Sequence, residues 1–138
     1  MKKIILVVAI GFMAMAATTQ MSFKNDKAVV KSALSDEKYK ACIDACNECI
    51  KSCNACESKC SKDTKMTACT QLCKDCVTAC KTAVKSMNAN SANVMSDCAA
   101  CAKACEACAT ECDKFTSDHC KKCAADCRKT AKLCNDMK

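Results

Sequence analysis

The chain has 138 residues, a formal net charge of +7, no proline, one glycine and nineteen cysteines. The length suits one domain, and the scarcity of glycine and proline excludes a β-rich fold full of tight turns. The net charge is modest and aromatic residues are 3% of the chain. We therefore expect no nucleic-acid partner, because such surfaces combine basic patches with aromatic stacking platforms.

The first sixteen residues have the pattern of a secretory signal peptide. Lys2 and Lys3 precede an apolar run from Ile4 to Met13, and Ala14-Met15-Ala16 forms an A-x-A cleavage site. The run is shorter than the roughly 18 residues that a spanning helix needs, so we expect no stable membrane anchor. The sequence predicts an exported protein, periplasmic in a bacterium, from which residues 1–16 are removed.

The rest of the chain is predicted to be helical. Residues 17–35 are interpreted as a flexible N-terminal segment, and residues 36–138 as the folded domain. Helices are expected over about 36–60 with Ser35 as N-cap, over 66–87 and 92–114, and from a cap at Thr116–Ser117 to about Asp136. Short connections between long helices favour antiparallel neighbours. The predicted fold is all-α, an antiparallel up-down-up-down four-helix bundle.

The cysteines recur at spacings of three and four residues, which places them on one face of an α-helix. Every predicted helix carries one such stripe, and large aliphatic residues are sparse beyond the leader. Because buried cysteine packs as a small hydrophobe, the stripes predict a cysteine-lined core. The four runs are Cys42, Cys46, Cys49, Cys53, Cys56, Cys60; Cys69, Cys73, Cys76, Cys80; Cys98, Cys101, Cys105, Cys108, Cys112; and Cys120, Cys123, Cys127, Cys134.

Several functions could use such a core. A disulfide-stabilised exported structural protein is one, although an odd number of cysteines leaves at least one unpaired. CxxC spacings such as Cys46–Cys49 suggest a thiol–disulfide enzyme, but those enzymes place a single pair at a helix start in a βαβ unit. We therefore do not expect an enzyme. A buffer for zinc or another soft metal, or an iron–sulfur site, remains an alternative.

Storage of many Cu(I) ions is the function that the pattern favours most. Thiolate is a soft ligand that selects soft Cu(I), and sulfurs at i and i+4 lie close enough to hold one small cation between them. One Cu⁺ also neutralises one thiolate, which avoids the cost of buried uncompensated charge. Eight pairs have this spacing: 42/46, 49/53, 56/60, 69/73, 76/80, 101/105, 108/112 and 123/127.

A four-helix bundle filled with CxxxC pairs behind an export signal resembles the bacterial copper storage proteins, over about residues 36–137. The resemblance implies that the cysteines of all four stripes bind Cu(I) inside the bundle. It also implies a homo-oligomer, and a copper chaperone or copper-requiring enzyme as partner. This chain departs from the pattern where Thr130 and Ala131 interrupt the last stripe, so we expect less copper near Cys134.

The two ends of the predicted bundle differ. The resemblance implies Met and His residues at an open end where copper enters. Met66 and His119, the only histidine, both lie at the end where the first helix stops, and we interpret them as metal-binding residues for entry. Met87 and Met95 lie at the opposite end, where Tyr39 and neighbouring valines predict an apolar plug.

Overall fold

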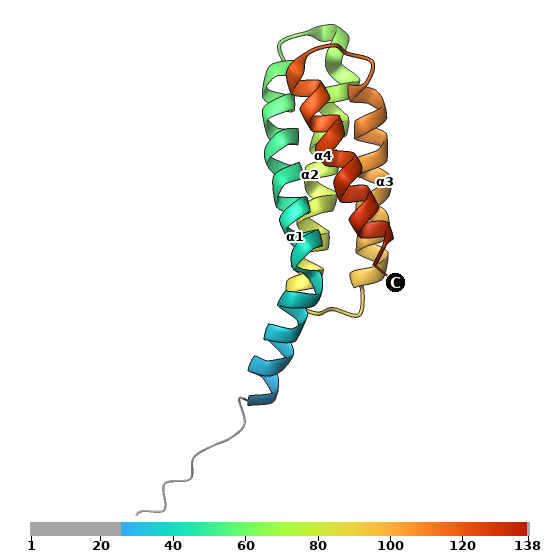
Figure 1. The fold of residues 1–138 in the computed structure, drawn as a ribbon. Coiled ribbons are helices and arrows are strands. Elements are labelled where there is room, and N and C mark those ends of the chain that lie inside the picture. The colour runs from blue at the N-terminus through green and yellow to red at the C-terminus, as the bar shows by residue number, and fades with distance from the viewer. Residues whose placement is uncertain (1–25, 138) are drawn as a thin grey trace, which may run out of the picture.

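The computed structural model describes residues 26–137 (Figure 1), with side chains from Glu37 onward. The elements are α1 (Asp26–Cys60), the short 3-10 helix η1 (Thr64–Met66), α2 (Thr67–Asn88), α3 (Val94–Cys112) and α4 (Asp118–Asn135). Within these residues there is no strand, and the all-α prediction is confirmed. The predicted leader, residues 1–16, lies outside the described residues.

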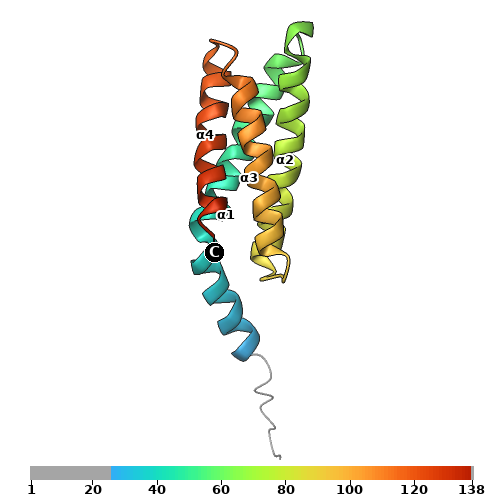
Figure 2. The same ribbon diagram turned by 90° about the vertical axis from the view of Figure 1, so that its right-hand side faces the viewer.

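The helices form the predicted bundle. α1 packs against α2 and α4, and α3 packs against the same two helices. Successive helices run in opposite directions, as Figures 1 and 2 show. The α1–α2 and α3–α4 connections therefore lie together at one end, which we call the double-loop end. The α2–α3 connection lies at the other, the α2–α3 end, beyond which the N-terminal part of α1 extends.

The first helix is longer than predicted. α1 begins at Asp26 instead of near Asp36, so Ser35 lies inside the helix and is not its N-cap. Residues 26–35 contain no glycine or proline and several good helix formers, so nothing in the sequence ends the helix there. These ten positions, which we had assigned to the N-terminal segment, belong to α1, whereas residues 17–25 lie outside the described residues. The other helices begin and end close to their predicted bounds.

The α2–α3 connection reverses the chain through Asn90, whose φ of 45° is the one positive value among the described residues. Asparagine tolerates this left-handed conformation better than most residues do. Backbone bonds from Asn90 N to Met87 O (3.0 Å) and from Ser91 N to Ser86 O (3.0 Å) satisfy carbonyls in the last turn of α2. This backbone geometry at Asn90 ends α2 and turns the chain toward α3.

Hydroxyl groups fix neighbouring helices to one another. Thr130 on α4 is fully buried, and its Oγ1 donates a hydrogen bond to the Ala45 carbonyl of α1 at 3.0 Å. Ser52 on α1 and Ser86 on α2 are also buried, and each donates to a carboxylate on the adjacent helix. The break in the last cysteine stripe at Thr130 therefore has a structural use, as a contact between α4 and α1.

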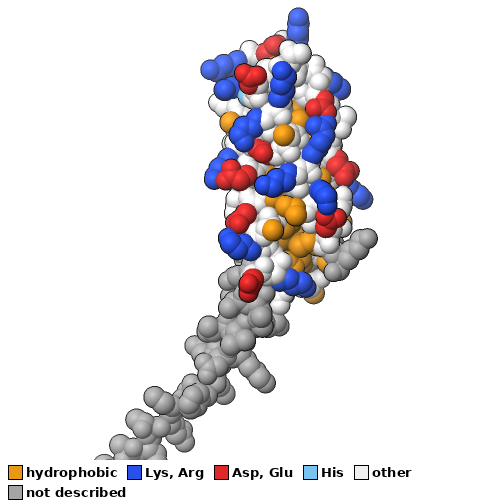
Figure 3. Space-filling model, viewed as in Figure 1, with side chains coloured by type: hydrophobic (Ala, Val, Ile, Leu, Met, Phe, Trp, Pro, Cys, Tyr) orange, Lys and Arg blue, Asp and Glu red, His pale blue; other side chains and the backbone are white. Residues whose placement is uncertain are grey.

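The outside of the bundle is strongly polar. Figure 3 shows basic and acidic side chains interspersed over the face formed by α1 and α4. Several form ion pairs within one helix, such as Lys40–Asp44 at 3.0 Å and Lys122–Asp126 at 2.7 Å, and such exposed pairs contribute little to stability. In the described part of the chain, every helix is too short or too polar to cross a bilayer.

We expect Thr130→Val to destabilise the reduced, copper-free bundle by about 0.5–1.5 kcal/mol, because it keeps the side-chain shape and removes one buried hydrogen bond. Urea denaturation followed by circular dichroism measures the change. The control is Thr78→Val, which removes an exposed bond to Lys74 O within α2. Equal effects of the two substitutions would contradict a role for Thr130 in joining α4 to α1.

Candidate metal centre

The helix faces that meet inside the bundle are made of sulfur. All nineteen cysteines are buried, and none is more than 3% exposed. Alanines such as Ala83, Ala102 and Ala124 lie beside them, and these small side chains let the helices approach closely. The cysteine-lined core predicted from the spacing is confirmed, and its column of thiols runs from Cys42 near the α2–α3 end to Cys60 at the double-loop end.

The closest sulfur contacts cross between helices. Between α1 and α4, Sγ atoms lie 3.4 Å apart in Cys42–Cys134 and 3.5 Å apart in Cys49–Cys127. Between α2 and α3, the Cys76–Cys105 distance is 3.5 Å. Three of the eight predicted i,i+4 pairs are also in contact, at slightly longer distances: 3.6 Å for Cys56–Cys60, 3.9 Å for Cys49–Cys53 and 4.0 Å for Cys101–Cys105. Interhelical neighbours were not predicted, because the spacing along one helix does not reveal which cysteines of another helix lie at the same level.

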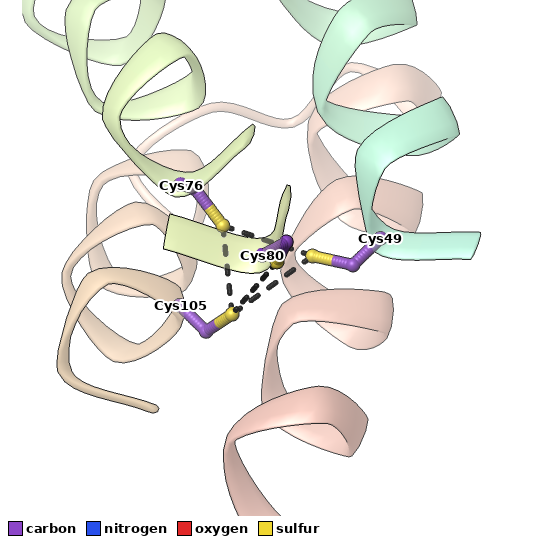
Figure 4. Close-up of side chains that lie close together, drawn as sticks. All are labelled: Cys49, Cys76, Cys80 and Cys105. Atoms are coloured by element: carbon purple, nitrogen blue, oxygen red, sulfur yellow. Dashed lines mark hydrogen bonds between the residues drawn. The ribbon is translucent and has the colours of Figure 1, made fainter. Parts of the chain in front are cut away.

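These contacts produce groups of four sulfurs that all lie within 4.8 Å of one another. Figure 4 shows one group, with thiols from α1, α2 and α3 directed toward a common point. Two sulfurs that each lie about 2.3 Å from one ion can be no more than about 4.6 Å apart, so this spacing suits metal binding. Five of the groups are Cys49/Cys76/Cys80/Cys105, Cys49/Cys53/Cys76/Cys127, Cys53/Cys108/Cys123/Cys127, Cys56/Cys60/Cys69/Cys120 and Cys56/Cys69/Cys73/Cys112.

The donor atoms of the core are soft. Apart from cysteine, the buried polar side chains in the described residues are Ser52, Ser86 and Thr130, and each uses its hydroxyl in a contact between helices. Carboxylates and imidazole are not among them. A cation that enters the core therefore meets thiols, which favour Cu(I) and other thiophilic ions over Mg²⁺ or Ca²⁺.

Burial keeps thiols of the core in their protonated form. Desolvation raises the pKa of Cys60 and of Cys98 to about 12. In contrast, hydrogen bonds from Cys134 and Cys46 lower the pKa of Cys42, since a thiolate gains from neighbours that donate to it. All nineteen cysteines are free thiols in the structure. Metal binding must therefore displace protons from this core, and cation and proton compete for the same sulfur atoms.

The two predicted entry residues lie in different surroundings at the double-loop end. Met66 belongs to η1 and is 9% exposed. His119 is partly exposed in the first turn of α4, where its Nε2 lies 3.2 Å from Ser117 Oγ. The cysteines Cys60, Cys69 and Cys120 near them are fully buried.

His119 also lines a groove that the sequence did not reveal. The groove has a volume of about 470 Å³ and lies between α1 and α4 on the outside of the bundle. No sequence signal marked it, because its walls come from two helices and consist of ordinary surface residues. They are Glu48, Lys51, Ser52, Ala55, Lys59, Asp118, His119 and Lys122.

The opposite end is closed as predicted, with one exception. Met87 is fully buried, and Tyr39 and Val94 are buried beside the first cysteines of the column. Met95, which we had placed in the same plug, is 51% exposed. Its side chain lies on the outer face of α3, so it does not close the core.

Comparison with known proteins agrees with this centre. A family model described as copper storage protein matches residues 35–138. No curated protein matches the chain. Apo copper storage protein 3 of Bacillus subtilis is 42% identical, with a TM-score of 0.69 over 72% of this chain and 97% of that one. The Cu(I)-bound form of that protein is 41% identical, with the same TM-score, over 72% and 96%. The chain belongs to the copper storage protein family.

Proposed function

We propose that this protein stores Cu(I) by binding it to the cysteines of all four helices, inside the bundle. The observation that carries the proposal is the continuous, purely sulfur core with its groups of four mutually close thiols. The similar Bacillus subtilis protein whose structure contains Cu(I) supports the choice of metal. The protein would act as a reservoir and not as an enzyme, as a homo-oligomer that exchanges copper with a chaperone or a copper-requiring enzyme.

The charge of Cu(I) fits this use of the core. Each Cu⁺ that replaces one thiol proton leaves the site neutral, so neighbouring sites can be filled without mutual repulsion. If each thiolate bridges two ions and each ion takes two thiolates, the capacity is roughly one Cu(I) per cysteine. The ligands would be the nineteen cysteines from Cys42 to Cys134, with less copper near Cys134.

We expect anaerobic Cu(I) titration of the reduced protein to give a capacity far above that of a single-site chaperone, approaching roughly one ion per cysteine. A chromophoric Cu(I) chelator competes for the metal and reports the free ion. Saturation at one or two ions per chain would contradict storage. Failure of reductant to expose titratable thiols would instead favour the structural disulfide protein.

The same titration should release protons. Cys60 and Cys98, with pKa values of about 12, are protonated at neutral pH, so Cu(I) must displace their protons. The affinity for Cu(I) should consequently increase as the pH rises toward these pKa values. The change should be about tenfold per pH unit for each proton released. A pH indicator in weakly buffered solution counts the protons. Copper uptake without proton release would show that the bound thiols were already ionised.

We propose that the protein is exported and loses residues 1–16, so that copper is stored outside the cytoplasm. The basic start, short apolar run and A-x-A site support this. Mass spectrometry of protein from its native host is expected to find an N-terminus near Ala17. Intact Met1 in protein recovered from outside the cytoplasm would refute processing.

We also propose that copper enters at the double-loop end, past Met66 and His119. The support is the four-sulfur group Cys56/Cys60/Cys69/Cys120, which adjoins this end, while Met87 and its apolar neighbours close the other. A thioether and a neutral imidazole can hold Cu(I) without first losing a proton, which suits a transient site.

The Met66→Ala/His119→Ala double variant is expected to load copper more slowly and to reach nearly the same final capacity. Loss of about 1 kcal/mol of docking free energy would slow uptake roughly fivefold. Stopped-flow measurement of Cu(I) uptake reports the rate. The control is Met95→Ala, which removes an exposed methionine near the other end. Slower loading in the control alone would place the entrance at the α2–α3 end.

A further inference from the structure

The four-sulfur groups have a geometry that single thiol pairs lack. In the group of Figure 4, Sγ of Cys105 lies 3.5 Å from Cys76, 3.9 Å from Cys80 and 4.0 Å from Cys49. The Cys49–Cys76 distance is 3.7 Å. The remaining two distances, Cys49–Cys80 and Cys76–Cys80, are within 4.8 Å. The four atoms thus enclose a roughly tetrahedral hole, with one sulfur from α1, two from α2 and one from α3.

The size of this hole matches a divalent ion. Four sulfurs arranged tetrahedrally at about 2.3 Å from a Zn²⁺ ion lie about 3.8 Å from one another. Two sulfurs on opposite sides of a linearly coordinated ion would instead be about 4.6 Å apart. Four of the six sulfur–sulfur distances in the group, at 3.5–4.0 Å, lie around the tetrahedral value, and the other two are within 4.8 Å. An ion could therefore occupy the hole after small adjustments of the thiol side chains.

We propose that the copper-free core also binds divalent d¹⁰ cations, Zn²⁺ or Cd²⁺, as buried tetrathiolate sites formed by these groups. This inference does not depend on copper storage, since it concerns the geometry of the core before copper arrives. It gives the protein a second role, as a store of thiophilic divalent ions that Cu(I) displaces, because soft thiolate ligands favour Cu(I).

Charge limits how this binding proceeds. At each site four S–H bonds break, four protons leave and four metal–sulfur bonds form, so the site retains a charge of −2. Such a charge is costly in a buried core unless donors surround it. Neighbouring protonated thiols outside the sites supply them. Cys101 lies 3.5 Å from Cys80, Cys73 lies 3.7 Å from Cys108, and Cys112 lies 3.6 Å from Cys69. These thiols must stay protonated, which prevents them from forming sites of their own.

The number of sites is limited by shared members. Nineteen thiols can form at most four complete groups without sharing, since five would need twenty. Three of the groups share no cysteine, so three divalent ions can be held at once. They are Cys49/Cys76/Cys80/Cys105, Cys53/Cys108/Cys123/Cys127 and Cys56/Cys60/Cys69/Cys120.

The test is an anaerobic titration of the reduced, copper-free protein with Cd²⁺ and, as a spectroscopic substitute, Co²⁺. We expect saturation at three or four ions per chain, with sulfur-to-metal charge transfer and the intense visible bands of tetrahedral Co²⁺. Added Cu(I) should then release the Cd²⁺. Any plateau outside three to four ions, or a Co²⁺ spectrum that is not tetrahedral, would overturn the proposal and leave copper storage intact.

A pair of variants identifies the sites. The first is a triple variant that breaks all five of the groups described above, with Cys49→Ser, Cys53→Ser and Cys56→Ser. It should lose at least three-quarters of the tetrahedral Co²⁺ signal. The control is a second triple variant that removes the same number of thiols and should keep three sites. Its substitutions are Cys42→Ser, Cys98→Ser and Cys134→Ser. Both variants should lose similar Cu(I) capacity, and circular dichroism should show that both keep the helical fold. Equal loss of the Co²⁺ signal in the two variants would refute the assigned groups.

Discussion

The core of this bundle can hold nineteen thiols only if it stays close to electrical neutrality. An ionised sulfur in such a core is costly unless a cation accompanies it, and burial accordingly raises the pKa of Cys60 and Cys98 to about 12. The empty core is held together by weak contacts between thiols at 3.4–4.0 Å. Every cation that enters must replace protons, so each sulfur atom is bound either to a proton or to a metal ion.

The same constraint shapes how the fold is stabilised. Cysteine and alanine bury little apolar area compared with leucine or phenylalanine, so the bundle needs other contacts. Met87 and Tyr39 pack at the α2–α3 end, and buried hydroxyls such as Thr130 join neighbouring helices. A metal ion in a four-sulfur group adds a stronger link, because it connects three helices at one point. Metal binding and stability are therefore coupled.

Much of this architecture could be predicted from the sequence. The three-and-four spacing of the cysteines fixes the helices and the face that each one buries, and the short connections fix their antiparallel order. The cross-bundle pairs, such as Cys42 with Cys134, could not be predicted. They depend on how far each helix is shifted along its neighbours, which spacing within one helix does not encode. The start of α1 was misplaced because Ser35 resembles an N-cap, although no helix breaker precedes it.

Surface features were less predictable than the core. Met95 and Met87 have similar positions near the ends of their helices, yet one is exposed and the other fully buried. The difference arises from which side of the helix each residue occupies, and an isolated methionine carries no periodic signal for that. The sequence placed His119 at the end of the bundle where the first helix stops, and it lies there. Its position in the groove could not be predicted, because the groove forms only where α1 packs against α4.

The number of metal ions that such a core can hold depends more on the charge of each ion relative to its thiolate ligands than on the number of sulfurs. A monovalent ion balances one thiolate, so adjacent sites stay neutral and every thiol can be used. A divalent ion in a four-sulfur group leaves two negative charges, so the neighbouring thiols must stay protonated. Most groups that share a cysteine therefore cannot be filled at the same time. Neighbouring groups overlap at Cys49, Cys53 and Cys56. This overlap limits the number of divalent ions, but it lets bridging thiolates connect successive Cu(I) ions along the column. A continuous column of overlapping groups is therefore suited to dense packing of a monovalent soft ion.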